Sequence, residues 1–250
     1  MRIHALIASS LLVIALADGE LAAQVTDSSS PNHVFAQFAD GRFSDGTFYR
    51  STVMVSSDNL SSINCTATLY GLTVAGFGDG STRSFNLASG GWNIYRTPGS
   101  QNFRKGYVTL NCNAAVTAQV LYTFHSSSGI VLSEATVFSS PAASIAQLLT
   151  DQRNGAQLGI AIANNGSTTK EFVIVAIDAG GFEVGRTGVQ IASRSQIARF
   201  LNELIGVPAD YVGQVHISTD TTDTFDVYAI GLRFTGSAFT TTPVTLRTPR

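Results

Sequence analysis

The chain carries little charge for its length. Of its 250 residues, 15 are Lys or Arg and 17 are Asp or Glu, which gives 13% charged residues and a formal net charge of −2. Proteins that bind nucleic acid through its phosphates need a basic face, which this composition does not supply. Anionic lipid likewise attracts polybasic segments, and the sequence has none. We therefore expect no nucleic-acid partner.

Long hydrophobic runs are also missing, apart from one at the N-terminus. Residues 5–17 form a largely apolar run that follows Arg2. A membrane span needs about 20 apolar residues. A positive start, a short apolar run and small residues after it are instead typical of a secretory signal peptide. We predict a signal peptide over residues 1–23, no membrane span in the mature chain, and secretion to an extracellular or periplasmic space.

Cysteine is scarce, with two residues in the chain, Cys65 and Cys112. Both lie in segments where apolar and polar residues alternate, and both share the apolar face of an expected strand. An oxidising compartment favours a disulfide between them. The disulfide would close a loop of 112 − 65 = 47 residues and contribute about 4 kcal/mol on the chain-entropy model. The alternative is two buried thiols that act as small hydrophobic side chains. We predict the disulfide.

The usual signatures of catalysis are absent from the sequence. The histidines outside the signal peptide, His33, His125 and His216, have no second His or Cys at metal-ligand spacing. There is neither an HExxH motif nor a G-x-S-x-G pentad, and the glycine-rich segment 76–81 lacks the Lys of a phosphate-binding loop. We therefore expect a protein that is not an enzyme. A hydrolase whose Ser–His–Asp triad assembles through space remains the alternative.

What the sequence does contain is an internal echo. Residues 157–178 read as two β-strands joined by a polar turn, and residues 50–71 read the same way. Further matches follow in the same order at offsets of 104 to 110, among them Gly106 with Gly213. Offsets held in order over about 100 residues indicate a duplication. The Asn-Gly pair at Asn154 belongs to a turn, because Asn and Gly both tolerate positive φ.

Each copy holds about seven short strands separated by turn signals, which is typical of antiparallel sandwiches, including immunoglobulin-like ones. The predicted fold class is therefore all-β, with two tandem antiparallel β-sandwich domains related by internal duplication. The boundaries are a linker over 24–32, a first domain over 33–139 and a second domain over 140–250. Because the connection between the copies is short, we expect the domains to touch.

One segment has helical periodicity. Residues 193–205 place apolar side chains on a single stripe, Ser193 and Gln196 fit a capping box, and Gly206 ends the segment. We predict one short helix here that covers an open end of the second sandwich. The equivalent segment of the first copy, residues 89–104, contains Gly and Pro and has no stripe, which predicts an irregular loop.

Four motifs carry a resemblance to a known group. They are FAQFADG (35–41), LGIAIANNGS (158–167), IARFLNELIGVPADYVGQVHIS (197–218) and GLRFTGSAFTTTPV (231–244). Together they resemble exported bacterial proteins with tandem β-sandwich copies of about 100 residues and no assigned function. The resemblance implies the fold and export, and it implies no activity. The first copy differs from the pattern because it lacks the helix and contains the cysteines.

Two sets of residues are candidates for binding. The first is aromatic and lies in or beside the divergent loop of the first copy: Phe77, Trp92, Tyr95, Phe103 and Tyr107. Exposed aromatic rings on a rigid β-scaffold hold sugar rings or protein partners. We nevertheless expect that Trp92 and Tyr95 fold down and plug the end of the sandwich, and the binding patch is the alternative.

The second set is acidic: Asp220, Asp223 and Asp226, with Asp40 and Asp45 in earlier turns. Oxygen-rich turns suit Ca²⁺, although this spacing is not that of an EF-hand loop. We expect a solvated turn and no cofactor, with Ca²⁺ as the alternative. The sequence thus predicts a secreted, non-enzymatic binding, adhesive or surface-structural module whose partner is a glycan or a protein surface. A carbohydrate-binding accessory protein that uses the loop around Trp92 is the second candidate.

Overall fold

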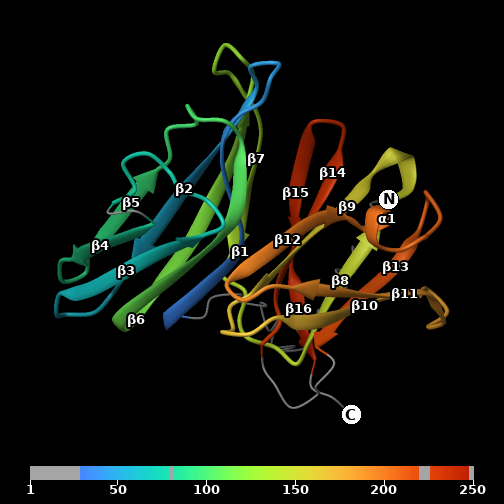
Figure 1. Cartoon of the computed structure of the whole chain (residues 1–250). Coiled ribbons are helices and arrows are strands. Elements are labelled where there is room, and N and C mark those ends of the chain that lie inside the picture. The colour runs from blue at the N-terminus through green and yellow to red at the C-terminus, as the bar shows by residue number, and fades with distance from the viewer. Residues whose placement is uncertain (1–28, 79–80, 220–225, 248–250) are drawn as a thin grey trace, which may run out of the picture.

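The structure, a computed structural model, describes residues 29–247 except 79–80 and 220–225. The predicted signal peptide, residues 1–23, lies outside the described residues. Most of the described chain is extended into strands that pair antiparallel (Figure 1). The prediction of an all-β fold is confirmed. No helix in the described part of the chain has the length and apolar character needed to cross a bilayer.

The first half of the chain is one seven-stranded sheet in the order β4-β3-β6-β1-β2-β5, with β7 paired to β6. Its long central strand, β6, pairs with β1 and β3 through its first part and with β2 and β7 through its second part. The strands are β1 (Ser30–Arg42), β2 (Phe48–Ser56), β3 (Ile63–Tyr70), β4 (Thr82–Leu87), β5 (Trp92–Arg96), β6 (Arg104–His125) and β7 (Val131–Phe138).

The two parts of β6 belong to two layers of the first half. We call β4, β3, the first part of β6 and β1 layer A, and we call β5, β2, the second part of β6 and β7 layer B. Alternate residues such as Leu110 of layer A and Val120 of layer B are fully buried in one core. Cys65 and Cys112 face each other across β3 and β6 and are joined by a disulfide.

The second half forms two separate sheets. Layer C has the order β12-β9-β14-β15, and layer D has the order β11-β10-β13-β8-β16. Their elements are β8 (Ile145–Asp151), the 3-10 helix η1 (Arg153–Gly155), β9 (Gln157–Asn164), β10 (Lys170–Asp178), β11 (Glu183–Ile191), β12 (Ser195–Phe200), α1 (Leu201–Leu204), β13 (Val212–Thr219), β14 (Tyr228–Thr235), β15 (Ala238–Thr242) and β16 (Val244–Arg247).

The two halves share a strand topology. Layer B matches layer C, and layer A matches layer D without β16. The recurring pairings are β1–β6 with β8–β13, β3–β6 with β10–β13, β3–β4 with β10–β11, β2–β6 with β9–β14, β2–β5 with β9–β12, and β6–β7 with β14–β15. In this topology β8 and β9 lie in different layers, which differs from an immunoglobulin-like sandwich, where the first two strands share a sheet.

Two glycines fix the register of the match. A Cβ atom on Gly106 would lie 2.0 Å from the carbonyl oxygen of Tyr70, and one on Gly213 would lie 2.2 Å from that of Ile177. Only glycine allows such an approach between neighbouring strands. Gly106 therefore takes the place in layer A that Gly213 takes in layer D, and Tyr70 takes the place of Ile177.

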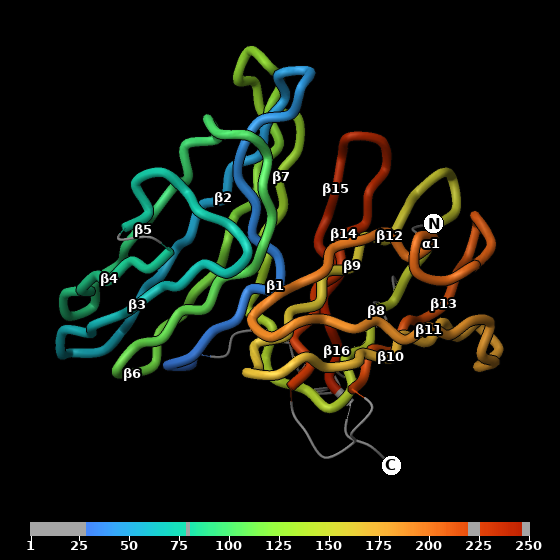
Figure 2. The backbone as a smooth tube through the Cα atoms, viewed as in Figure 1, coloured from blue at the N-terminus to red at the C-terminus, as the bar shows by residue number. Residues whose placement is uncertain are grey.

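Layer C is the junction between the halves. Ile160 and Ile162 of β9 point into the core shared with layer D, whereas Ala161 and Ala163 point into the core of the first half, so both faces of β9 are buried. Strands β9 and β14 of the yellow-to-red half lie beside β1 of the blue-to-green half in the centre of the molecule (Figure 2).

The predicted helix over 193–205 is largely wrong. Residues 195–200 form the edge strand β12, and the helix is limited to α1, at Leu201–Leu204. The loop predicted over 89–104 is wrong as well, because β5 pairs there with β2 as β12 pairs with β9. Strand β1 starts at Ser30, within the residues that the sequence analysis assigns to the linker.

The turn predicted at Asn154 is confirmed. Asn154 has φ 58° and Gly155 has φ 74°, both in the left-handed region that Asn and Gly tolerate. The turn lies in η1 and connects β8 in layer D with β9 in layer C.

Candidate functional site

The structure does not gather the predicted aromatic residues into one patch. Trp92 and Tyr95 lie on opposite faces of β5, because their positions differ by an odd number of residues. The side chain of Trp92 points to solvent and is 70% exposed. Tyr95 packs inward, with its ring edge to face against the buried Phe77 at 5.0 Å between centroids. Phe103 lies elsewhere, at the junction between the halves.

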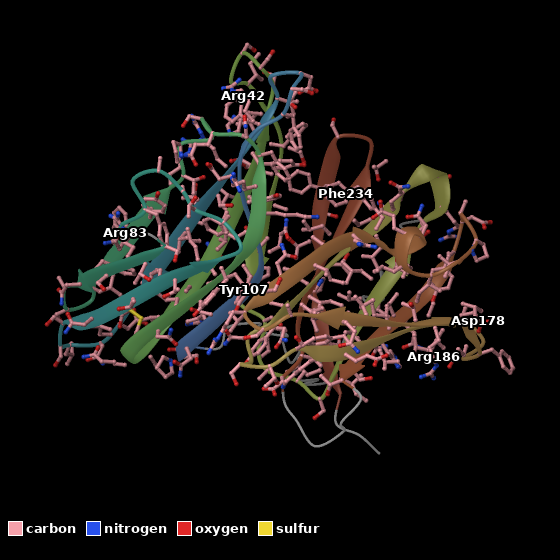
Figure 3. All side chains as sticks on the ribbon, in the orientation of Figure 1. Arg42, Arg83, Tyr107, Asp178, Arg186 and Phe234 are labelled. Carbon is pink, nitrogen blue, oxygen red and sulfur yellow. A yellow bond between two sulfur atoms is a disulfide. The ribbon has the colours of Figure 1, made fainter. Side chains whose placement is uncertain are left out.

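Tyr107 is a structural residue of the junction. Its ring is fully buried and stacks on Tyr70 at 4.6 Å, and its hydroxyl donates to Oδ1 of Asn165 in the second half, at 3.2 Å. Burial raises the pKa of Tyr107 to about 12, so the phenol stays protonated and remains a donor at neutral pH. Figure 3 shows Tyr107 between the two halves, far from Arg83 and Arg186 at the opposite ends.

The acidic residues do not form a described metal site. Asp226 makes an ion pair with Lys170, and Asp220 and Asp223 lie outside the described residues. Asp40 is buried and accepts a hydrogen bond from the Gly99 amide at 2.8 Å, whereas Asp45 accepts from Thr47 in a surface turn. Within the described ranges, no three His, Cys, Asp or Glu side chains are grouped as metal ligands.

The histidines have separate local partners. His33 Nε2 lies 2.9 Å from the carbonyl oxygen of Val116, and His125 Nε2 lies 3.2 Å from the hydroxyl of Thr123. Burial lowers the pKa of His125. His216 faces outward on β13, as the alternation predicts, and its Nε2 lies 3.2 Å from Oε1 of Gln214. The three rings belong to different layers or strands.

One concave feature is a hollow of about 330 Å³ between the halves, which we call the aromatic cleft. Strands of both halves supply its rings, most of which are half-buried. Lys105, Arg199, Glu203 and Gln37 are its polar residues. The aromatic lining residues are Tyr49, Phe103 and Tyr122 from the first half and Phe200 and Phe234 from the second.

The rings of the cleft support one another. Tyr49 stacks on Tyr122 at 4.7 Å, and Phe200 meets Phe234 edge to face at 5.3 Å between centroids. Phe43 stacks on Phe103 at 4.4 Å. Offset or edge-to-face pairs of this kind are favourable and hold ring orientations. The wall of the cleft is therefore built of fixed aromatic faces.

The polar groups of the cleft are partly used by the fold. Lys105 Nζ donates to the carbonyl oxygen of Ala198 at 2.8 Å, and Glu203 Oε2 accepts from the amide of Phe200 at 2.8 Å. The side chain of Arg199 is exposed at the rim. Burial raises the pKa of Tyr49 to about 12, so its hydroxyl is a neutral donor.

A second, more open hollow of about 620 Å³ continues the cleft and shares Tyr49, Phe200 and Phe234 with it. Its other lining residues are aromatic or polar: Phe43, Ser44, Asp45, Thr47, Phe124, Gly236 and Ser237. The two hollows together form a groove that runs along the seam of the halves. Figure 3 shows Phe234 at this seam.

Sequence reasoning identified Phe103 and missed the other rings of the cleft. Tyr49 and Phe234 are 185 residues apart (234 − 49) and come together only because layer C packs on the first half. The sequence nevertheless contains a signal for these residues. Tyr49, Phe200 and Phe234 are large aromatic residues near the ends of strands, beside polar residues. Such rings at strand ends mark positions where another surface is close.

Comparisons with known proteins give no identity. No family model matches the chain, and no curated protein matches it. Among solved structures, the chain aligns with a provisionally assigned secreted protein from Parabacteroides distasonis ATCC 8503 at 11% identity and a TM-score of 0.23, over 84% of each chain. At that TM-score the likeness supports no conclusion about this chain.

Proposed function

We propose that this chain is a secreted, non-enzymatic binding module made of two copies of one β-unit, and that the aromatic cleft holds an oligosaccharide. The observation that carries the proposal is the cleft, a set of half-buried aromatic faces with polar groups between them at the seam of the halves. The shared strand topology supports the duplication. The disulfide supports an oxidising compartment.

The chemistry of the cleft favours a sugar. A pyranose ring has apolar C–H faces that pack on aromatic side chains and hydroxyl groups that need polar partners. The wall supplies ring faces such as Phe103 and Phe234, and the rim supplies the guanidinium of Arg199 and the carboxylate of Glu203. The groove is open along the second hollow, where Asp45 and Ser237 lie, which suits a chain of several sugars.

The same features argue against a lipid ligand and against hydrolysis of a bound sugar. A lipid chain is favoured by an enclosed apolar tunnel, whereas this groove has polar residues along its length. Hydrolysis of the bound sugar by a carboxylate pair needs two acids that flank the bond. Glu203 already accepts a hydrogen bond from the Phe200 amide, and Asp45 accepts from Thr47. Binding without turnover is the function that this chemistry supports.

The test is a glycan array followed by calorimetric titration with the best glycan. Phe103→Ala removes one wall of the cleft and is expected to weaken binding about tenfold, because a stacked ring contributes roughly 1 kcal/mol beyond its area. Trp92→Ala is the matched control, since Trp92 is exposed but far from the cleft lining. It is expected to bind like the wild type.

Three results would overturn the proposal. Loss of binding in Trp92→Ala with retention in Phe103→Ala would move the site to β5, as the second candidate from the sequence has it. An array without any bound glycan would exclude the oligosaccharide. Release of reducing sugar from the bound glycan, or labelling by a serine-directed hydrolase probe, would show an enzyme.

A further inference from the structure

The junction between the halves uses two different faces. Each half has an outer face on each of its two layers. The outer face of layer C in the second half packs on the outer face of layer A in the first half, and the edge strand β15 of layer C also contacts β7 of layer B. The contacts include Tyr107 with Asn165, the guanidinium of Arg194 over the ring of Tyr70, and Gln196 with the carbonyl oxygen of Gly106 at 3.2 Å.

The two outer faces that the described residues leave uncovered, called the free faces below, are of the same two types. Layer B of the first half corresponds to layer C, and layer D of the second half corresponds to layer A. A contact in which layer B of one molecule packs on layer D of another would therefore repeat the junction that already exists inside the chain. Such a contact joins unlike faces, so it leaves one free face at each end and can continue.

Strand pairing identifies the residues of the free face on layer B. Ala161 and Ala163 on the buried face of layer C pair with Ala198 and Gln196. The equivalent pairs of layer B are Met54 with Ile94 and Ser56 with Trp92. Across the sheet, Gln119 pairs with Phe138 on the same face. Trp92, Ile94 and Phe138 are 70%, 49% and 38% exposed.

The free face on layer D is found in the same way. Gly106 and Gly213 are equivalent, so Gln214 takes the place of the junction residue Tyr107, and His216 takes the place of Thr109. Leu149 pairs with Gln214 and is 64% exposed. Val173 and Val175 are half-buried beside them on β10. This face is apolar and amide-rich around Leu149 and Gln214, and the charged side chain of Arg186 lies beside Val175.

The two free faces have the chemistry of a protein interface, because each carries exposed apolar side chains. Layer B offers a large aromatic anchor, Trp92, beside aliphatic Ile94 and Met54. Layer D offers the exposed aliphatic side chain of Leu149 beside the amide of Gln214. Aromatic anchors surrounded by neutral groups carry most of the energy of protein interfaces, and charge is depleted at their centres.

We propose that molecules of this protein assemble head to tail, with the outer face of layer B, centred on Trp92 and Ile94, packed on the outer face of layer D, centred on Leu149. The partner is a second copy of this chain. The contact repeats between molecules the packing of layer C on layer A. It uses neither the aromatic cleft nor strand pairing at a sheet edge, so it can be tested independently of glycan binding.

The experiment is sedimentation velocity of the mature chain over a wide concentration range, with negative-stain electron microscopy at the highest concentration. The wild type is expected to show an average mass that rises with concentration, and linear chains on the grid. Trp92→Glu and Leu149→Glu each damage one face and are expected to weaken association at least about tenfold, because each removes an anchor from the centre of the contact. Both sites are exposed, so unchanged melting temperatures show that the variants fold.

Mixing the two variants gives the sharpest result. Trp92→Glu keeps a sound layer D face and Leu149→Glu keeps a sound layer B face, so an equimolar mixture is expected to form one-to-one dimers that do not grow. Phe182→Arg is the control: Phe182 is 72% exposed in the turn between β10 and β11, outside both faces, and this variant is expected to assemble like the wild type.

Several results would overturn the proposal. A wild type that stays monomeric at every concentration would do so. So would either single variant forming dimers as readily as the wild type, because that would show that the substituted face is not part of the contact. Failure of the mixture to form dimers, with both variants folded, would show that the two faces do not meet. Glycan binding lost in Trp92→Glu while assembly is unchanged would assign the Trp92 face to sugar instead.

Discussion

Single side chains in this protein show how burial and hydrogen bonding act against each other. Asp40 is 3% exposed and accepts a hydrogen bond from Gly99, and burial raises the pKa of its carboxyl above the ordinary 3.8. Asp45 is exposed, and the hydroxyl and amide of Thr47 hold the pKa of its carboxyl below 3.8. The two carboxyls are five residues apart in sequence, and their pKa values are shifted in opposite directions.

The pair gives a pH-dependent prediction. Asp40 has a raised pKa in the folded state, so the stability it contributes is present below pH 3.8 and is lost as the pH rises through its folded pKa. Asp40→Asn keeps an acceptor for Gly99 and cannot ionise. The free energy of unfolding of this variant, measured with urea, is therefore expected to gain on the wild type as the pH rises above 3.8.

Asp45→Asn is the matched control, because the lowered pKa of Asp45 reverses the sign. The stability contributed by Asp45 is present above pH 3.8 and is lost as the pH falls. The free energy of unfolding of this variant is expected to fall relative to that of the wild type as the pH rises above 3.8. Parallel pH profiles for the two variants would contradict the assignment of Asp40 as a carboxyl penalised by burial.

At the scale of the element, β9 is a strand with both faces buried. Ala163 on β9 is fully buried at the junction and pairs with Gln196. Ser56 on β2 has the equivalent place, pairs with Trp92, and is exposed on the outer face of layer B. The same position is thus tightly packed in one half and open in the other.

Leucine at these two positions should therefore have different effects. Ala163→Leu is expected to lower the free energy of unfolding by about 1–3 kcal/mol, because it overpacks the junction. Ser56→Leu is expected to change it by about 0.5 kcal/mol or less. Denaturant unfolding of both variants measures the difference. Equal effects would show that layer C does not pack against the first half as described.

How far the sequence predicted these elements depends on how many faces of each strand are buried. In strands such as β3, which has one buried face, buried and more exposed residues alternate. The pattern over residues 50–71 therefore predicts this strand. Strand β12 meets the core of the second half through Ile197 and the cleft through Phe200, so its apolar residues do not alternate. Together with Leu201 and Ile205 they fall by coincidence at helical spacing, which predicted a helix over 193–205.

The candidate site was less predictable than the fold for a related reason. Segment patterns report which face of a strand is apolar, but they do not report which surface covers that face. The expected plug is wrong for Trp92, which is exposed on the outer face of β5, in a segment where the sequence predicted a loop. The cleft needs the packing of layer C on the first half, and no local pattern around Tyr49 or Phe234 specifies that packing.

At the scale of the whole molecule, the two halves share a hydrophobic core. Ile230 and Leu232 of layer C belong to the core cluster of the first half, while Leu158 of the same layer belongs to that of the second. Separation of the halves would expose the apolar outer face of layer C. Two domains joined by a polar seam would be free to unfold one after the other, and this junction is not of that kind.

The chain is therefore expected to unfold as one cooperative unit. Differential scanning calorimetry should show a single transition whose calorimetric enthalpy equals its van't Hoff enthalpy. Dilute protein is needed, so that self-association does not add to the transition. Two resolved transitions, or a calorimetric enthalpy well above the van't Hoff value, would show that the halves unfold independently.

The last strand of the chain sets an order of events during synthesis. Every pairing among β1 to β7 closes within residues 30–138, whereas β8 takes one of its two neighbours from β16, at Val244–Arg247. When the first half has been synthesised, all of its strands are present. Layer D is complete only after residues 244–247 have been added. Layer A is then already formed when layer C emerges, and it offers the growing chain a surface on which to fold.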